Sequence, residues 1–238
     1  MPTGESTAYD ALRAAILSFD LLPGERVSER GLEGGIGGSR TPIRAALMRL
    51  ENEGLVQRAD RGWRVAPIDL AEVRAAMEFR EALEAATTTL AVERARDDEL
   101  EALAALVDAH RRDDDEETGL RDGSDFHMAL ARLSGNPFLV EALGDVMTRL
   151  WRTRWLEVRT ARSRTNARDE HLAIVDAVRR RDADDAARLV VAHARGTRDR
   201  LLGSLTAQRR GLRGRGLSII DSGSDGATPA AVGSSTSA

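Results

Sequence analysis

Between residues 69 and 205, apolar side chains recur at the three- and four-residue spacing of helical faces almost without interruption. Aromatic residues make up only 3% of the chain, so the core must be aliphatic and rich in alanine, which favours helices over sandwiches or barrels. Breaks at Gly119, at 135–137 and at 181–182 divide the stretch into helices. We expect these helices near residues 69–96, 97–117, 122–134, 137–160, 165–181 and 183–204. The sequence therefore predicts a mainly α fold whose second part is an antiparallel all-helical bundle.

The first 67 residues have a different pattern. A helix is expected over 8–19, ending at the turn Leu22-Pro23-Gly24, and Ser28 can cap a short second helix that the glycine run at 34–38 breaks. Ser39 can cap a third helix that runs to about Asn52. Two short strands at 55–56 and 63–65 surround a hairpin turn. The order is thus helix, helix, helix, hairpin, within a unit that we place at 8–67.

The C-terminal segment and the composition further restrict the class of protein. After residue 205 the chain turns to Gly, Ser, Thr and Ala, and we expect a disordered tail over 206–238. The chain has no cysteine, which excludes a disulfide framework and a thiol nucleophile. It has no apolar run near the roughly 20 residues that span a bilayer, and no signal-peptide core. We therefore expect a soluble, cytoplasmic protein without a membrane partner.

Residues 39–50, SRTPIRAALMRL, carry the clearest signal for DNA binding. Ile43, Leu47 and Leu50 form a core stripe, while Arg40 and Arg44 lie only about 40° apart on an adjoining arc. The segment holds three arginines and no acid, although the chain as a whole has a net charge of −4. A short helix with arginines near its start suits the major groove, where arginine can hold guanine bidentately. The alternative is an exposed face of a small helical domain with scattered arginines.

This segment resembles the winged helix-turn-helix of the GntR family of regulators. The matching stretches are 22–30 (LPGERVSER), 39–47 (SRTPIRAAL), Leu50, 53–56 (EGLV) and 62–65 (GWRV). The resemblance implies that Arg30, Arg40, Thr41 and Arg44 contact operator DNA, together with Ser39 at the helix start, and that Gly62 enters the minor groove at the wing tip. The glycine-rich stretch 33–38 departs from the family pattern, and each helical glycine costs roughly 1 kcal/mol. A second helix that frays until DNA binds is the expected consequence.

Residues 69–205 resemble the all-helical FCD effector domain of the FadR subfamily, in its six-helix VanR-like group. The matching stretches are 79–84 (FREALE), 126–130 (FHMAL), 134–137 (SGNP), 170–175 (EHLAIV) and 186–193. The resemblance implies a domain that binds a small effector and forms a homodimer.

Three of the four histidines fall on apolar helical faces. His127 shares its face with Leu130, and His171 and His193 are placed similarly on two other predicted helices. Each of them alone could be an ordinary core histidine, but three in one small bundle more often converge on a metal ion. His110, beside two arginines at a helix end, is expected to be exposed.

Arg80 lies on the apolar stripe of the first bundle helix, together with Glu84. An arginine there must be paired or must face a polar cavity. It can form an ion pair with Glu84 within the helix, or hold a ligand carboxylate bidentately. The resemblance implies the second role, so the predicted effector-binding set is Arg80, His127, His171 and His193.

The predicted metal ligands are His127, His171 and His193, and the fourth position departs from the FCD pattern. That pattern has an aspartate four residues before the first histidine, where this chain has Gly123. Asp122 and Asp125 lie about 140° and 160° away from the face of His127 on a regular helix. Asp122 could replace the ligand if the helix started late. Loss of a carboxylate disfavours hard ions and leaves zinc, nickel or copper as the expected divalent metal ion.

The sequence thus predicts a transcriptional regulator, a repressor in our reading, which binds a double-stranded DNA operator as a homodimer. A small carboxylate in the helical domain would control it. Two alternatives remain open. One is a regulator without an effector, and the other is a metal-dependent hydrolase, for which Glu170 and Glu84 are the candidate bases. The second alternative would leave the arginine helix unused, and we expect no enzyme activity.

Overall fold

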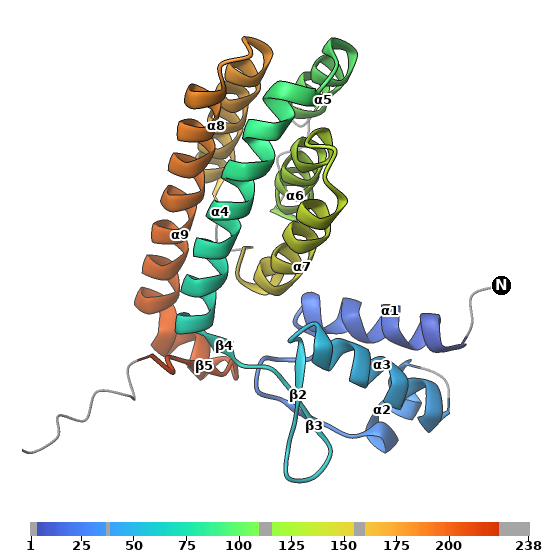
Figure 1. Ribbon diagram of the computed structural model, residues 1–238. Coiled ribbons are helices and arrows are strands. Elements are labelled where there is room, and N and C mark those ends of the chain that lie inside the picture. Colours follow the sequence, from blue (N-terminus) through green and yellow to red (C-terminus); the bar gives the residue numbers. More distant parts are fainter. Residues whose placement is uncertain (1–3, 37–38, 110–115, 155–159, 224–238) are drawn as a thin grey trace, which may run out of the picture.

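The computed structural model describes residues 4–36, 39–109, 116–154 and 160–223, and it has a small N-terminal unit at one end of a helical bundle (Figure 1). The N-terminal unit contains α1 (Gly4–Leu17), α2 (Glu29–Ile36) and α3 (Arg40–Asn52). Strands β1 (Arg26–Val27), β2 (Val56–Arg58) and β3 (Trp63–Val65) form an antiparallel sheet in the order β1-β3-β2. This is a winged helix-turn-helix, as expected, with β1 as an element that the sequence analysis did not identify.

The core of this unit explains its elements. Leu12 and Ile16 of α1 are buried against Ile43, Leu47 and other apolar residues of α3. The wing strand β3 contributes Trp63, which is only 1% exposed. The apolar stripe predicted on α3 therefore does face the core, and the arginines of that helix are left on its outer side.

Helix α2 continues through glycines that were expected to break it. Gly34 and Gly35 lie inside the helix, and positions 37–38 are outside the described residues. Two features stabilise α2: the Ser28 hydroxyl accepts a hydrogen bond from the Gly31 amide at 3.1 Å, and Leu32 is buried in the core. Burial and capping at the start of the helix thus outweigh the low helix propensity of glycine at its end.

The bundle has six helices among the described residues: α4 (Leu70–Arg94), α5 (Asp97–Ala109), α6 (Glu116–Leu133), α7 (Pro137–Arg154), α8 (Ala161–Arg179) and α9 (Ala183–Gly214). All six were expected. Helix α6 starts at Glu116, earlier than the predicted residue 122, so the stretch before His127 is regular helix. His110 lies outside the described residues. No helix in the described ranges has both the length and the apolar character needed to cross a membrane.

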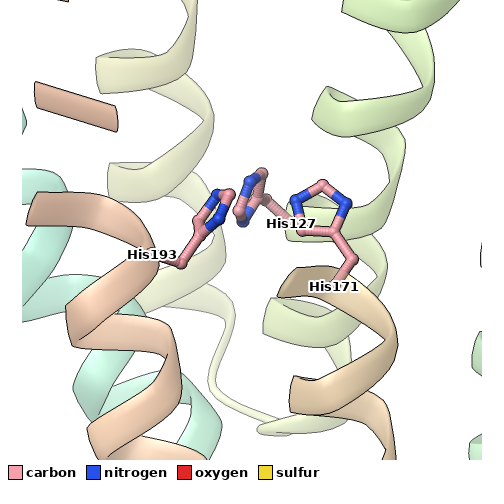
Figure 2. Close-up of side chains that lie close together, drawn as sticks. All are labelled: His127, His171 and His193. Carbon is pink, nitrogen blue, oxygen red and sulfur yellow. The ribbon is translucent and has the colours of Figure 1, made fainter. Parts of the chain in front are cut away.

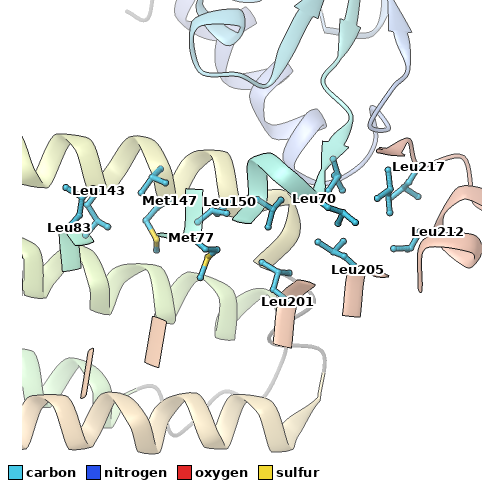
Figure 3. Close-up of a cluster of buried hydrophobic side chains, with 14 of the residues drawn as sticks. Leu70, Met77, Leu83, Leu143, Met147, Leu150, Leu201, Leu205, Leu212 and Leu217 are labelled. Atoms are coloured by element: carbon cyan, nitrogen blue, oxygen red, sulfur yellow. The ribbon is translucent and has the colours of Figure 1, made fainter. Parts of the chain in front are cut away.

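Two apolar clusters fill the bundle. The cluster nearer the N-terminal unit joins α4, α7 and α9, and includes Met77, Leu143, Leu150 and Leu201 (Figure 3). The other lies among α5, α6, α8 and α9 and includes Phe126 and Val178. Both clusters are mainly aliphatic, as expected from the composition, but only the second is rich in alanine.

The prediction of a disordered tail from residue 206 is wrong for the described part of that segment. Helix α9 continues to Gly214, and β5 (Ile219–Ile220) then pairs in parallel with β4 (Ile68–Asp69). Ile219 is fully buried, and the Ser218 amide donates a hydrogen bond to the Pro23 carbonyl at 2.8 Å. The C-terminal segment therefore connects both units, and residues 224–238 lie outside the described residues.

Helix α7 makes further contacts between the two units. The Arg152 side chain is 6% exposed and donates from Nη1 to the carbonyl of Ala66 at 2.6 Å. Arg149 donates to the carbonyl of Asn52 at 3.4 Å, and Arg13 of α1 donates to the Thr148 hydroxyl at 3.3 Å. The connection between the units is thus held by hydrogen bonds from the C-terminal half of α7.

Candidate functional site

The predicted DNA-contacting residues gather on one face of the N-terminal unit. Arg30, Arg40 and Gly62 help line a shallow recess of about 290 Å³ between the start of α2, the start of α3 and the wing. Arg44 and Thr41 are also exposed on α3. The fold thus brings together side chains that are separated by up to 32 residues in the sequence.

Two acids of α2 pair with the arginines of α3, which the sequence analysis missed. The Arg40 Nε donates to Glu33 at 3.2 Å, and Arg44 lies 4.0 Å from Glu29. Both guanidinium groups are more than 60% exposed, so these pairs are weak and can be exchanged for contacts with phosphate or bases.

Ser39 and Gly62, two further residues of the predicted DNA-contacting set, lie at the start of α3 and in the wing turn. Ser39 is the N-cap of α3, but its side chain makes no capping hydrogen bond, so the expected cap is formed by backbone position alone. Gly62 has a φ of +81°, and a Cβ there would lie 3.0 Å from the Val27 carbonyl oxygen. A tight wing turn with this backbone conformation needs glycine.

In the helical bundle, three histidines converge from three helices, α6, α8 and α9 (Figure 2). His127, His171 and His193 are each at least 94% buried, and each offers a ring nitrogen within 4.8 Å of the others. The ring of Phe126 stacks on His171 with 4.1 Å between centroids. The three histidines thus form one cluster, which we call the histidine cluster.

Two carboxylates orient the rings. Glu170 Oε2 lies 2.6 Å from Nδ1 of His193, which directs the other nitrogen of that ring away from Glu170. Glu84 Oε1 lies 3.0 Å from Nδ1 of His127. A carboxylate behind a histidine fixes the tautomer and makes the far nitrogen a better metal ligand. The two acids named as candidate bases of a hydrolase therefore face histidine rings.

Arg80 is fully buried and forms the ion pair with Glu84, which is one of the two roles that the sequence left open. Its Nε donates to Glu84 at 2.8 Å, and its Nη2 lies 2.7 Å from Nε2 of His127. Because arginine only donates, Nε2 of that ring is the acceptor and the ring proton lies on the Nδ1 side. Nη1 of Arg80 has no hydrogen-bond partner, although it is buried. Arg80 is thus both an ion-pair partner and a donor at the edge of the histidine cluster.

Burial and charge keep His127 and His171 neutral. Burial lowers the pKa of His127 to about 3, although Glu84 acts in the opposite direction. Burial also lowers the pKa of His171 far below its usual value, with further lowering by the neighbouring histidines and by Arg80 and Arg154. The pKa of Glu84 is depressed because Arg80 and His127 outweigh the effect of burial. Neutral imidazoles next to ionised carboxylates are the protonation states that a metal site needs.

Position 123 lies beside the histidine cluster, but with different chemistry from the FCD pattern. A Cβ on Gly123 would lie 3.9 Å from Cε1 of His171 and 3.3 Å from Nη2 of Arg154. Asp125 is exposed, and since α6 is regular helix at Asp122, neither acid joins the group of possible ligands. The late helix start that would have brought Asp122 to the cluster is not observed.

Arg154 is the residue of this region that the sequence analysis missed. It is 3% exposed, and its Nη1 donates to the Ser124 hydroxyl at 2.7 Å. The signal was present, because Arg154 continues the buried stripe of Met147 and Leu150 on α7. The reasoning used for Arg80, that an arginine on an apolar stripe needs a polar partner, applies to Arg154 as well.

Three imidazole nitrogens can hold a divalent metal ion, which suits zinc, nickel or copper, once Nε2 of His127 gives up its contact with Arg80. Nε2 of His171 is buried without a hydrogen-bond partner, as expected of a nitrogen that has a metal to bind. Two buried guanidinium groups flank the same histidines and can bind a carboxylate.

Comparison with known proteins agrees with both units. Residues 5–65 match the model of the gntR family of bacterial regulatory proteins, and residues 75–196 match the FCD domain. The Nta operon transcriptional regulator of Aminobacter aminovorans is 30% identical over 189 residues, which cover 78% of this chain and 89% of the relative. The transcriptional repressor RspR of Escherichia coli is 26% identical over 191 residues, covering 78% and 83%.

A solved structure has the same fold. Escherichia coli McbR/YncC matches with a TM-score of 0.73 at 19% identity, over 86% of this chain and 99% of that one. The matched relatives are regulators, which leaves the hydrolase alternative without support. This chain therefore belongs to the GntR family of DNA-binding transcriptional regulators and carries an FCD domain.

Proposed function

We propose that this regulator is a repressor whose affinity for DNA is controlled by a small carboxylate bound beside a divalent metal ion at the histidine cluster. The observation that carries the proposal is the convergence of three buried histidines with the fully buried Arg80. Residues 8–67 would read the operator, and residues 69–205 would sense the ligand.

The metal part of the proposal rests on His127, His171 and His193, with zinc or nickel as the expected ion. The test is the metal content of protein purified without a chelator or a histidine tag. We expect about one equivalent in the wild type and little in His171→Ala, whose imidazole has a buried nitrogen without a partner. An equal metal content in both proteins would contradict this assignment.

The ligand part rests on Arg80. Its Nη1 is a buried donor without a partner, and its Nη2 contacts His127, so a carboxylate at the metal would meet guanidinium donors. Such a ligand can change DNA affinity only by binding one arrangement of the two units better than another. Binding of the ligand with no change in operator affinity would leave the alternative of a regulator without effector control.

The DNA part rests on Arg30, Arg40 and Arg44, with Ser39, Thr41 and Gly62 beside them. Sequence-preferring duplexes would be selected from a random library, and their affinity measured at moderate salt. We expect Arg44→Ala to lose this preference, and Arg132→Ala, an exposed arginine on α6, to retain it. Equal affinity of the wild type for any duplex would contradict operator recognition.

We further propose that the protein acts as a homodimer on a near-palindromic operator, since one winged helix contacts only one half-site. Phe79 of α4 and Phe138 of α7 are exposed to 51% and 80%, which is unusual for large apolar side chains and suits burial against a second copy. Sedimentation analysis of the wild type tests this. A monomer at the concentrations that bind DNA would contradict it.

A further inference from the structure

At position 123 this chain differs in charge from the FCD pattern. The FCD pattern has a metal-binding aspartate there, whereas this chain has Gly123, and the buried guanidinium of Arg154 lies next to that position. Nη2 of Arg154 would lie 3.3 Å from a Cβ at that position, and the same Cβ would lie 3.9 Å from the ring of His171. A positive group therefore lies beside the position where the pattern has a negative one, and that position borders the ring of His171.

Arg154 is held in this place from two helices. It extends from the last turn of α7, is 3% exposed, and donates from Nη1 to the hydroxyl of Ser124 on α6. Sδ of Met147 lies 3.7 Å from the same nitrogen. A guanidinium carries five N–H donors in a planar fork, so it can hold a ligand oxygen in addition to its present contacts.

Resting on the proposed function, we propose that Gly123 and Arg154 form a subsite for a carboxylate of the ligand, which takes the place of the missing aspartate. Gly123 has no side chain to occupy the position of the aspartate, Arg154 supplies the positive charge, and the ring of His171 borders the same position. Metal and carboxylate then bind to this chain as a pair, and each raises the affinity for the other. A chain that kept the aspartate would bind the metal without needing the ligand.

The test measures nickel affinity by calorimetry in a carboxylate-free buffer, with and without acetate as the probe. In the wild type we expect acetate to raise nickel affinity about 10-fold, because mutual coupling of this size is ordinary for linked ligands. Gly123→Asp places a protein carboxylate in the subsite, and the close contact falls on the flexible end of Arg154. We expect this variant to bind nickel more tightly than the wild type without acetate, and to gain less than about 3-fold from it.

Two further variants sharpen the test. Arg154→Gln should lose the acetate effect, and without acetate it should bind nickel at least as tightly as the wild type, because a positive charge near His171 is removed. Gly203→Asp is the matched control, because Gly203 is an exposed helical glycine with nothing within 4 Å of its Cβ position. It should behave like the wild type.

The outcomes separate this inference from the proposed function. Nickel binding that acetate does not change, or an acetate effect that survives in Gly123→Asp, overturns the subsite and leaves the metal site standing. Inorganic phosphate acting as strongly as acetate overturns the assignment to a carboxylate. No nickel binding by the wild type under any condition, with binding restored in Gly123→Asp, overturns the metal-dependent function and the inference together.

Discussion

Replacement of Arg80 by alanine should destabilise the helical bundle severely, whatever the ligand does. Arg80 is fully buried and Glu84 is 2% exposed, with 2.8 Å between Nε and Oε1. Without the guanidinium, the carboxylate of Glu84 would stay buried with a single neighbour, His127, whose pKa is too low for it to carry charge at neutral pH. Breaking a buried pair in this way typically costs about 3–5 kcal/mol. We expect Arg80→Ala to lose this much stability in urea unfolding followed by far-UV circular dichroism.

A double variant separates the structural role of Arg80 from its proposed role in ligand binding. Arg80→Met combined with Glu84→Leu removes both charges and keeps the apolar volume, so it should be more stable than Arg80→Ala. It should stay below the wild type, because buried His127 then loses both of its polar neighbours. Arg96→Ala, which breaks an exposed ion pair with Asp98, should leave stability nearly unchanged. A loss below about 1 kcal/mol in Arg80→Ala, or a double variant as unstable as the single one, would refute the reasoning.

The remaining predictions concern pH, the chain end, the wing and the linker. Because the pKa of buried His127 is about 3, against 6.5 for the free group, the unfolded chain binds more protons between these values, and the melting temperature should fall as the pH is lowered from about 7.5 to about 5. A pH-independent melting temperature would contradict the burial of neutral histidines. A chain that ends at Gly216 loses the buried Ile219 and should lose about 3 kcal/mol in urea unfolding, while a deletion from residue 224 alone should cost little. Gly62→Ala places a Cβ at φ +81° and 3.0 Å from a carbonyl oxygen, so it should lower the stability of the N-terminal unit by about 1–2 kcal/mol and weaken DNA binding; an unchanged unfolding curve would refute the strain argument. Arg152→Gln should bind metal and carboxylate like the wild type but show a smaller ligand effect on DNA affinity in an anisotropy titration; a ligand effect of full size would show that the contact with Ala66 is not needed.

The elements that sequence predicts best here are those with local signals. The apolar stripe of α3, the cap at Ser28 and the periodicity of the bundle helices each depend on residues a few positions apart, and they are observed. The histidine cluster was also predictable, because each histidine lies on an apolar face of its own helix and a bundle turns such faces toward one another.

The features that were missed depend on distant contacts. Ile219 pairs with Ile68, about 150 residues earlier, and nothing in the glycine-rich composition around it marks that partner. Helix α2 keeps its glycines because Leu32 is buried by α1 and α3 residues, which local propensity does not include. The guanidinium beside Gly123 comes from α7, so an analysis of α6 alone finds an empty position where the fold places Arg154.

The last turn of α7 lies next to both the proposed ligand subsite and the segment that connects the DNA-binding unit to the bundle. Arg154 faces Gly123 and the histidine cluster, while Arg152, two residues earlier, donates to the Ala66 carbonyl in the segment that leads from the wing to the bundle. Arg152 and Arg154 lie on the same helical turn. A position of α7 that suits a ligand at Arg154 therefore also fixes where the Arg152 guanidinium lies relative to the Ala66 carbonyl. Burial lowers the pKa of Arg152 to about 10, yet at neutral pH it remains charged, and a buried charged donor is costly to separate from its acceptor. The proposed connection between ligand and DNA affinity therefore needs no long chain of residues, because the same helix end lies beside Gly123 and contacts the segment that leads to the bundle.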